Sequence, residues 1–519
     1  MKVTTWIIFV IFVSNNISFC QTVNDTPEFV VVKSKNVKIN KEKHQLIQGY
    51  IEVPENRNLP FSKKIKLPVE IYKSTNPSPK EPVFRLAGGP GESNIPKYIS
   101  NTDLLKNHDF VFVGYRGVDG STQLKSKELA KAMKGKNHQL LSDESLDHIE
   151  QTAANYLREI KQKGIDINAY TIMDVIEDLE YAREAIRYEH INLLSGSFGT
   201  RIALLYSYKH PEKIHRIVMN GANPPGHFLW YPDKTEEILN QWEILYIAEG
   251  IGSIKDAMKK AYDQMPEKWG IFTLDKDKVK SGTFVFLFST QMAVMAFDAY
   301  IRAAQKNDYS GLYMIQEAYN LFVPRNTWGD MFQKGFSADF NPDINYRQYL
   351  RSFDESTLLG ANYALLLWGS AGTWSGKSIP ESFKLLQPSH TETLILSGDL
   401  DVSTPADFAT QKLLPSMPFA QQKVFRNMSH LDVANIQPLS YQAIINEFFL
   451  TGHANFSAFK EATINFKPKY RLYHIAKGIF LVMALISIVF LYFLVIFLRK
   501  VYQRYKSKGY VTRRLERYV

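Results

Sequence analysis

The stretch that decides the fold of this chain is "HINLLSGSFGTRIALLYSYKHPEKIHRIVMNG", residues 190–221. A short apolar run enters it, and small residues then crowd the next positions: Ser195, Gly196, Ser197 and Gly199. A helix-like pattern leaves this cluster over residues 198–209, and a second apolar run follows. Small residues between a strand and a helix indicate a sharp turn that has no room for larger neighbours.

The rest of the body alternates strand and helix patterns. Residues 46–53 and 65–74 are expected to form an opening antiparallel pair. Further strands are expected in residues 81–91, 108–117, 190–196, 214–221, 391–398 and 423–429. Helices are expected in residues 171–189, 198–209 and 441–450, and after Pro405. This alternation predicts an α/β fold with a doubly wound, mostly parallel sheet.

One segment, residues 225–385, interrupts the alternation with mostly helical patterns and holds six of the seven tryptophans. We interpret it as a helical cap inserted between two parts of a core, residues 21–224 and 386–465. Most of these tryptophans should form the core of the cap, and a few should line a pocket. The Lys-rich residues 122–137 are expected to form a solvated excursion.

Charge and cysteine content exclude several classes of protein. The net charge of +10 is concentrated in residues 467–519, which carry +11, so the remainder is close to neutral. A basic terminus of this kind argues for a membrane before a nucleic acid, and no nucleic-acid partner is expected. Cys20 is the only cysteine, which rules out a disulfide framework and a cysteine-rich metal site.

Both ends of the chain indicate export. Residues 1–20 combine Lys2, a short apolar run and small residues, as a cleavable secretory signal does. Residues 478–498 contain no charge and, at ~1.5 Å per residue, would span a bilayer of about 30 Å. Eight Lys/Arg follow this segment and four precede it from Lys467, which predicts that the tail, residues 499–519, is cytoplasmic. The body would then lie on the exported side, periplasmic or extracellular.

Three residues in a particular chain order suggest nucleophilic catalysis. Ser195-Gly196-Ser197-Phe198-Gly199 fits a nucleophile elbow with Ser197 at its tip, although Ser195 replaces the usual first glycine. A serine hydroxyl needs a base and an orienting acid, in the order Ser, Asp or Glu, His on this fold. Asp399 and Asp401 follow one predicted strand and His430 follows the next, so all three groups should meet at one edge of the sheet.

An oxyanion site is also expected. The backbone N–H of Phe198 and the loop containing Gly88 and Gly89 would supply its donors. That loop lacks the Lys-Ser/Thr of a phosphate-binding loop, and there is no H-E-x-x-H motif, so neither a cofactor nor a metal is expected.

At these residues the sequence resembles the α/β-hydrolase serine peptidases of the proline iminopeptidase and tripeptidyl aminopeptidase type. Residues 87–91, Ala-Gly-Gly-Pro-Gly, match the family's His-Gly-Gly-Pro-Gly loop except at Ala87, and residues 116–121 match its Arg-Gly segment loosely. The family's acid turn matches residues 398–405, which selects Asp401 over Asp399 as the acid, and its histidine falls on His430. In the family a helical cap selects the substrate, and acidic cap residues hold its free amine. Glu236, Glu237 and Glu243 are candidates by location.

These features lead to three functional hypotheses. The first is a membrane-anchored serine peptidase that removes residues or short peptides from the N-terminus of its substrate. The second keeps the same machinery for small esters, as a carboxylesterase or lipase. The third is an inactive hydrolase fold that serves as a binding or adhesion ectodomain.

Overall fold

The body of the protein is built around one nine-stranded sheet, seen in a computed structural model that describes residues 26–515 apart from 138 and 373. Its strands are β1 (Phe29–Ile39), β2 (Glu42–Pro54), β3 (Lys64–Tyr72), β4 (Lys80–Leu86), β5 (His108–Val113), β6 (Ile191–Gly196), β7 (Ile214–Asn220), β10 (Glu392–Gly398) and β11 (Ala420–Phe425). They lie in the order β1-β2-β3-β5-β4-β6-β7-β10-β11. The first pairings, up to β3 with β5, are antiparallel, and all later ones are parallel.

Helices cover both faces of the parallel part of the sheet. Successive side chains of each strand point to opposite faces, so each face has its own core. Val83, Leu194 and Leu394 pack with α15 (Pro438–Thr451) on one face. Neighbouring side chains such as Phe84, Leu193 and Ile395 belong to the core on the other face, with α3 (Ile172–Ile186) and α4 (Phe198–Lys209). The predicted α/β architecture with a mostly parallel sheet is therefore confirmed.

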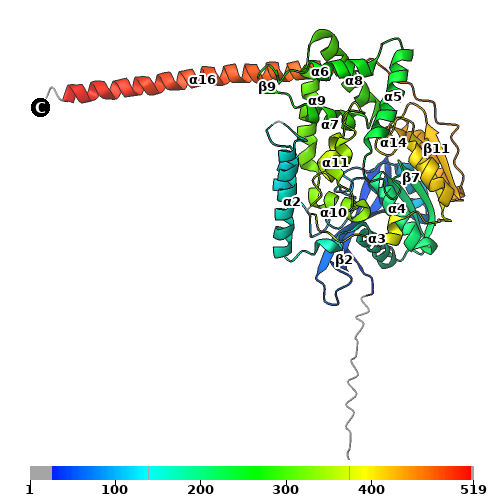
Figure 1. Ribbon diagram of the computed structural model, residues 1–519. Coiled ribbons are helices and arrows are strands. Elements are labelled where there is room, and N and C mark those ends of the chain that lie inside the picture. Colours follow the sequence, from blue (N-terminus) through cyan, green and yellow to red (C-terminus); the bar gives the residue numbers. More distant parts are fainter. Residues whose placement is uncertain (1–25, 138, 373, 516–519) are drawn as a thin grey trace, which may run out of the picture.

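A helical segment joins β7 to β10 and lies beyond the carboxyl ends of the parallel strands (Figure 1). Its helices are α5 (Pro232–Ala248), α6 (Ile254–Asp263), α7 (Lys276–Phe286), α8 (Thr290–Lys306), α9 (Ser310–Phe322), α10 (Trp328–Asp339), α11 (Tyr346–Arg351) and α12 (Asn362–Trp368). It also contains a small hairpin, β8 (Lys268–Trp269) and β9 (Phe272–Thr273). Trp242, Trp328 and Trp368 are fully buried in it. The division into core and cap at residues 225 and 385 stays a prediction.

Several elements differ from the expectations. β1 and α2 (Asp143–Gln162) were not predicted, and β11 begins three residues before the predicted strand and ends at Phe425. The Lys-rich residues 122–137 are not a solvated excursion, because α1 (Lys127–Ala132) lies within them and buries Leu129 and Ala132. In this segment lysines alternate with apolar residues that pack against the body. The charged side chains therefore lie only on its outer side. After Pro405 the chain forms α13 (Ala406–Phe408), then a short π-helical turn, and α14 (Asp432–Asn435) follows β11.

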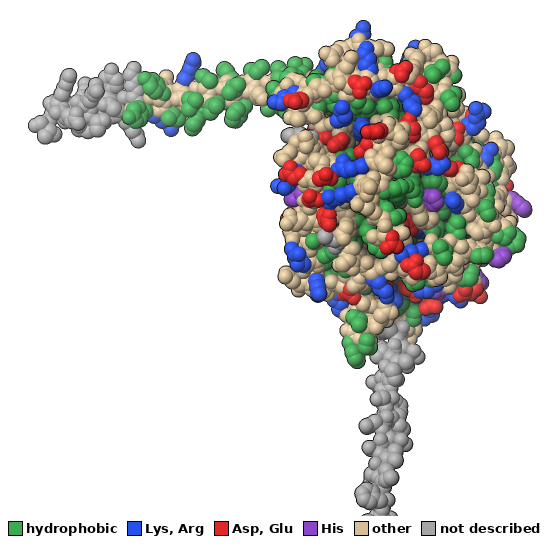
Figure 2. All heavy atoms as spheres, viewed as in Figure 1, with side chains coloured by type: hydrophobic (Ala, Val, Ile, Leu, Met, Phe, Trp, Pro, Cys, Tyr) green, Lys and Arg blue, Asp and Glu red, His purple; other side chains and the backbone are tan. Residues whose placement is uncertain are grey.

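One long helix, α16 (Leu472–Leu515), begins next to the body and projects away from it towards the C-terminus of the chain (Figure 1). The most apolar 18-residue window within residues Leu472–Tyr505 has a mean hydropathy of 3.1, and this window is not buried by the rest of the chain. Figure 2 shows apolar side chains along most of the coloured part of α16, whereas the visible face of the body carries many charges of both signs. This helix is long and apolar enough to cross a membrane. The predicted signal segment, residues 1–20, lies outside the described residues.

Candidate functional site

Ser197 occupies a strained turn between β6 and α4. Its backbone has φ +51°, which a residue with a side chain rarely adopts, and its peptide N–H donates to Asn220 O at 2.9 Å. A Cβ on Gly199 would collide with the carbonyl oxygen of Leu86, so the turn needs glycine there. The strain presents the Ser197 hydroxyl at the carboxyl edge of the sheet, where it lines a pocket.

Ser195 stands where the elbow usually has its first glycine, and it fits without disturbing this turn. It is buried, and its hydroxyl donates to Val218 O at 2.8 Å in the neighbouring strand. The hydroxyl is therefore satisfied by the sheet itself and points away from the chemistry of Ser197.

Asp401 and His430 form a buried pair at the same edge. The Nδ1–H of His430 donates to Asp401 Oδ2 at 2.8 Å. The same carboxylate accepts hydrogen bonds from the backbone N–H groups of Ser403 and Thr404 and from the Thr404 hydroxyl, at 2.7–2.8 Å. Asp401 is thus fixed by four donors and orients the imidazole. Asp399, by contrast, accepts from Met428 N at 3.2 Å and does not touch His430.

The environment of His430 alters its pKa. Burial by itself lowers the pKa of the imidazole, but the adjoining Asp401 carboxylate more than offsets this, so the pKa of His430 stands above its ordinary value. Gly221, with φ +66°, lies against the ring, since a Cβ there would approach His430 Cε1 to 3.1 Å. The ring is therefore held in place on two sides.

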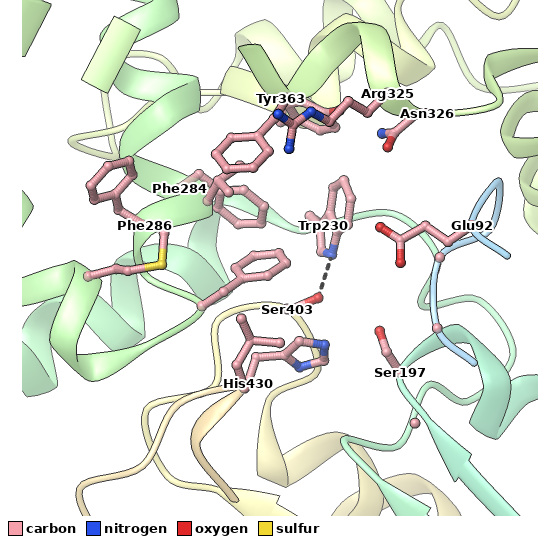
Figure 3. A pocket seen from close by; sticks show the side chains of 18 of the residues that line it. Glu92, Ser197, Trp230, Phe284, Phe286, Arg325, Asn326, Tyr363, Ser403 and His430 are labelled. Carbon is pink, nitrogen blue, oxygen red and sulfur yellow. Dashed lines mark hydrogen bonds between the residues drawn. The ribbon is translucent and has the colours of Figure 1, made fainter. Parts of the chain in front are cut away.

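Ser197 and His430 face each other across the floor of the pocket (Figure 3). No hydrogen bond joins them among the described residues, and Figure 3 draws none. In unliganded sites such bonds are often long and close as substrate binds. The structure therefore brings the three predicted residues to one place, with the bond between acid and base formed and the bond between base and hydroxyl open.

The predicted oxyanion donors lie beside Ser197. A Cβ on Gly88 would come within 3.0 Å of Ser197 Cβ, so this backbone approaches the serine closely. Phe198 is the first residue of α4, where no carbonyl of the helix accepts its N–H. In the part of the chain that the structure describes, the N–H groups of Gly88 and Gly89 donate no hydrogen bond either. These donors remain available to a negatively charged oxygen.

The pocket above these residues has a volume of about 720 Å³. Its upper walls come from the helical segment and are largely aromatic and apolar: Trp230, Phe284, Phe286, Phe288, Met292, Met331 and Tyr363. Trp230 Nε1 also donates to Ser403 Oγ at 3.2 Å, next to the acid loop (Figure 3). The walls therefore present a mostly apolar surface above Ser197.

The pocket also contains polar side chains that the sequence did not predict, among them Glu92, Arg325 and Asn326 (Figure 3). Glu92 is exposed, and its side chain has no hydrogen bond or ion pair with any described residue. Glu92 follows the glycine loop directly, and a carboxylate two residues after Pro90 was the available sequence signal. Arg325 and Asn326 carried no such signal, because their position depends on how α9 and α10 pack.

The predicted amine-binding residues lie elsewhere. Glu236 pairs with Lys255, and its other oxygen accepts from Leu358 N at 2.8 Å. Glu237 pairs with Lys234 at 2.8 Å, and Glu243 accepts from Lys255 N at 3.0 Å. None of the three lines the pocket, and Glu237 is exposed to solvent. Glu92 takes their place as the pocket carboxylate.

Comparison with known proteins places this geometry in context. Residues 81–249 match the family model for the alpha/beta hydrolase fold. The chain is 25% identical over 204 residues to a tripeptidyl aminopeptidase of Streptomyces lividans, covering 36% of this chain and 38% of that protein. It is 28% identical over 149 residues to the serine protease Hip1 of Mycobacterium tuberculosis, covering 27% of this chain and 29% of that protein. A solved proline iminopeptidase of Mycobacterium smegmatis aligns with 77% of this chain and 97% of its own, at 11% identity and a TM-score of 0.37.

The chain has the alpha/beta hydrolase fold. The resemblance to tripeptidyl aminopeptidases that the motifs predicted is confirmed at low identity, and the aligned parts span less than two fifths of those relatives' lengths.

In this hydrolase fold the helical segment is bonded directly to the glycine loop. Asp330 of α10 accepts from Gly91 N at 3.1 Å, and Thr327 N donates to Gly91 O at 3.3 Å. The Lys334 ammonium donates to Asp330 Oδ1 at 2.5 Å and to Arg116 O at 2.9 Å. Asp330 and Lys334 are both fully buried, so the pair joins the two parts without contact with water.

A second set of bonds holds the histidine loop. Leu431 N donates to Phe288 O at 2.8 Å, and the Asp432 carboxylate accepts from Thr290 N at 2.8 Å. Phe288 itself packs edge-on against the His430 ring, at 5.2 Å between centroids. The helical segment therefore holds both the glycine loop and the His430 loop in position.

We expect Asp330→Asn to destabilise the protein by about 3–5 kcal/mol, because it leaves the Lys334 charge buried without its partner. It should also lower turnover, since Gly91 loses a charged acceptor. The measurement is denaturant unfolding of the full chain in detergent, with Asp343→Asn as the matched control, an exposed carboxylate on the same helical segment. Equal stability of the two variants would contradict this role of Asp330.

Proposed function

We propose that this chain is a membrane-anchored serine hydrolase that removes N-terminal residues or short peptides from its substrates. The observation that carries the proposal is the buried Asp401–His430 pair facing Ser197 on the floor of one pocket. Separate strands deliver the three groups, and the oxyanion donors lie beside them. This set of groups is the one that acyl transfer requires.

In the proposed mechanism, Ser197 Oγ attacks the substrate carbonyl carbon while His430 Nε2 takes its proton. The oxyanion that forms accepts hydrogen bonds from Phe198 N–H and from the Gly88 and Gly89 loop. His430 then gives the proton to the leaving amine, the C–N bond breaks, and an acyl-enzyme remains. Water, deprotonated by His430, attacks this ester and restores Ser197. Asp401 holds the imidazole in the required tautomer throughout.

Glu92 supports a peptide with a free N-terminus as the substrate. It is a solvent-exposed carboxylate that lines the mostly apolar pocket next to the glycine loop, and it has no ion pair with a described residue. In the proposal, a substrate ammonium replaces the water around this carboxylate with a charge-assisted hydrogen bond. The names of the relatives, tripeptidyl aminopeptidase and serine protease, agree with this assignment. The aromatic walls favour the alternative of an apolar ester, which leaves Glu92 without a role.

Anchoring by α16 is part of the proposal. Its apolar surface is not covered by the body, and eight Lys/Arg follow residue 498. The excess of positive charge on that side supports a cytoplasmic tail and an exported catalytic body.

We expect Glu92→Gln to lower kcat/KM for a free-amine peptide amide by about 10- to 100-fold, the worth of one charged hydrogen bond. The same variant should leave turnover of the N-acetylated peptide and of a matched acyl ester unchanged. Steady-state kinetics on the three substrates provide the test, with Glu237→Gln, outside the pocket, as the control. A strong preference for esters without amide turnover would exclude the peptidase assignment.

A further inference from the structure

The hairpin formed by β8 and β9 exposes an apolar tip. Gly270, with φ +61°, and Ile271 form its two-residue turn, and Leu274 N donates to Glu267 O at 2.8 Å to close its base. Gly followed by another residue is a favoured two-residue hairpin turn, so the sequence specifies this shape. Ile271 at the tip is 78% exposed, although nothing in the turn requires a large apolar residue there.

This hairpin lies directly beside the start of the apolar helix α16 (Figure 1). The rings of Trp269 and Phe272 each lie 6.1 Å from the ring of Phe480, in edge-to-face arrangements. Tyr313 of α9 completes the cluster, at 5.3 Å from Trp269 and 4.9 Å from Phe272. Phe480 is the third residue of the charge-free run that begins at residue 478. The apolar surface of the hairpin is therefore continuous with that of α16.

The root of α16 is fixed to the body, which also fixes the position of the hairpin relative to the helix. Leu472, Tyr473 and Ala476 are buried against the body. Lys477 Nζ pairs with Asp308 at 2.6 Å, and the Arg302 guanidinium lies 3.8 Å from the centre of the Tyr473 ring. Where α16 enters a bilayer, the hairpin must therefore come to the surface of that bilayer.

We propose that the β8–β9 hairpin is a second membrane contact, with Ile271 inserted at the boundary between headgroups and acyl chains. Trp269 and Tyr313 would lie at the headgroup level, where aromatic side chains with a polar edge are favoured, and the exposed Lys268 would meet lipid phosphates. The inference rests on the proposed anchoring by α16. Together with the fixed root of α16, the hairpin contact holds the body in one orientation on the membrane.

The test uses the full chain in vesicles of phosphatidylcholine and phosphatidylglycerol. Cys20, the only cysteine, is replaced by serine, and a nitrobenzoxadiazole dye is attached to Ile271→Cys, Phe490→Cys or Phe61→Cys in turn. Phe490 is an exposed position on α16, and Phe61 is 96% exposed on the body. Lipids that carry a doxyl quencher at carbon 5 or carbon 12 of the acyl chain report the depth of each dye.

We expect at least twofold stronger quenching at position 271 by the shallow quencher than by the deep one. Position 490 should be quenched most by the deep quencher, and position 61 by neither. Quenching at 490 without quenching at 271 overturns the hairpin contact and leaves anchoring intact, and no quenching at either position overturns both. Shielding at 271 that disappears on tenfold dilution of protein in lipid would identify a second copy of the chain as the occupant, against the proposal. Peptide turnover by the same labelled proteins tests the hydrolase function separately.

Discussion

Ser197→Ala is expected to reduce kcat by about 10⁶-fold, the effect of removing the nucleophile from a complete serine triad. The hydroxyl is the only group in the proposed mechanism that forms a covalent bond to the substrate. Its removal creates no cavity of consequence, because the side chain is partly exposed on the floor of the pocket. The fold should therefore be retained while turnover disappears.

Labelling with a fluorophosphonate probe measures this effect together with turnover of a peptide amide. Ser195→Ala is the matched control, two residues away and also a serine. Its buried hydroxyl bonds to Val218 O, so this variant should lose about 1 kcal/mol of stability and keep its labelling. If wild type is not labelled, the inactive ectodomain replaces the hydrolase. Labelling that persists in Ser197→Ala would assign the nucleophile to another residue.

Asp401→Asn is expected to lower kcat by about 10⁴-fold, because an amide next to the imidazole favours the wrong tautomer. The same change removes the charge that raises the pKa of His430. The base acts in its neutral form, so wild-type kcat/KM should rise with pH through a pKa above the ordinary value of about 6.5 for histidine. In the variant this acidic limb should move to lower pH.

The full pH dependence of kcat/KM for both proteins checks these two effects. Asp399→Asn is the control, since Asp399 lies in the same turn but bonds to Met428 N, away from His430. It should leave the acidic limb in place and change turnover by less than tenfold. The reverse result, a large loss in Asp399→Asn and a small one in Asp401→Asn, would contradict the assignment of the acid.

Local patterns predicted the core of the fold well. The apolar run and small residues around Ser197 gave a strand, a turn and a helix within one residue of their observed bounds. β1 was missed because its valines alternate irregularly with lysines at the edge of the sheet, where little of the strand is buried. α1 was misread because its lysines conceal a buried side, and burial depends on what packs against it.

The residues of the site also fall into two groups, those predicted from local sequence and those placed by tertiary packing. The sequence by itself determined the elbow, the glycine loop, the acid turn and the apolar helix, because each depends on neighbours within a few residues. Only the tertiary structure decided that Asp330 holds Gly91 and that Phe288 packs on His430. It also decided that Glu92 replaces Glu236, Glu237 and Glu243 in the pocket. These contacts join segments up to about 240 residues apart, and their existence depends on how helices pack, which no local pattern encodes.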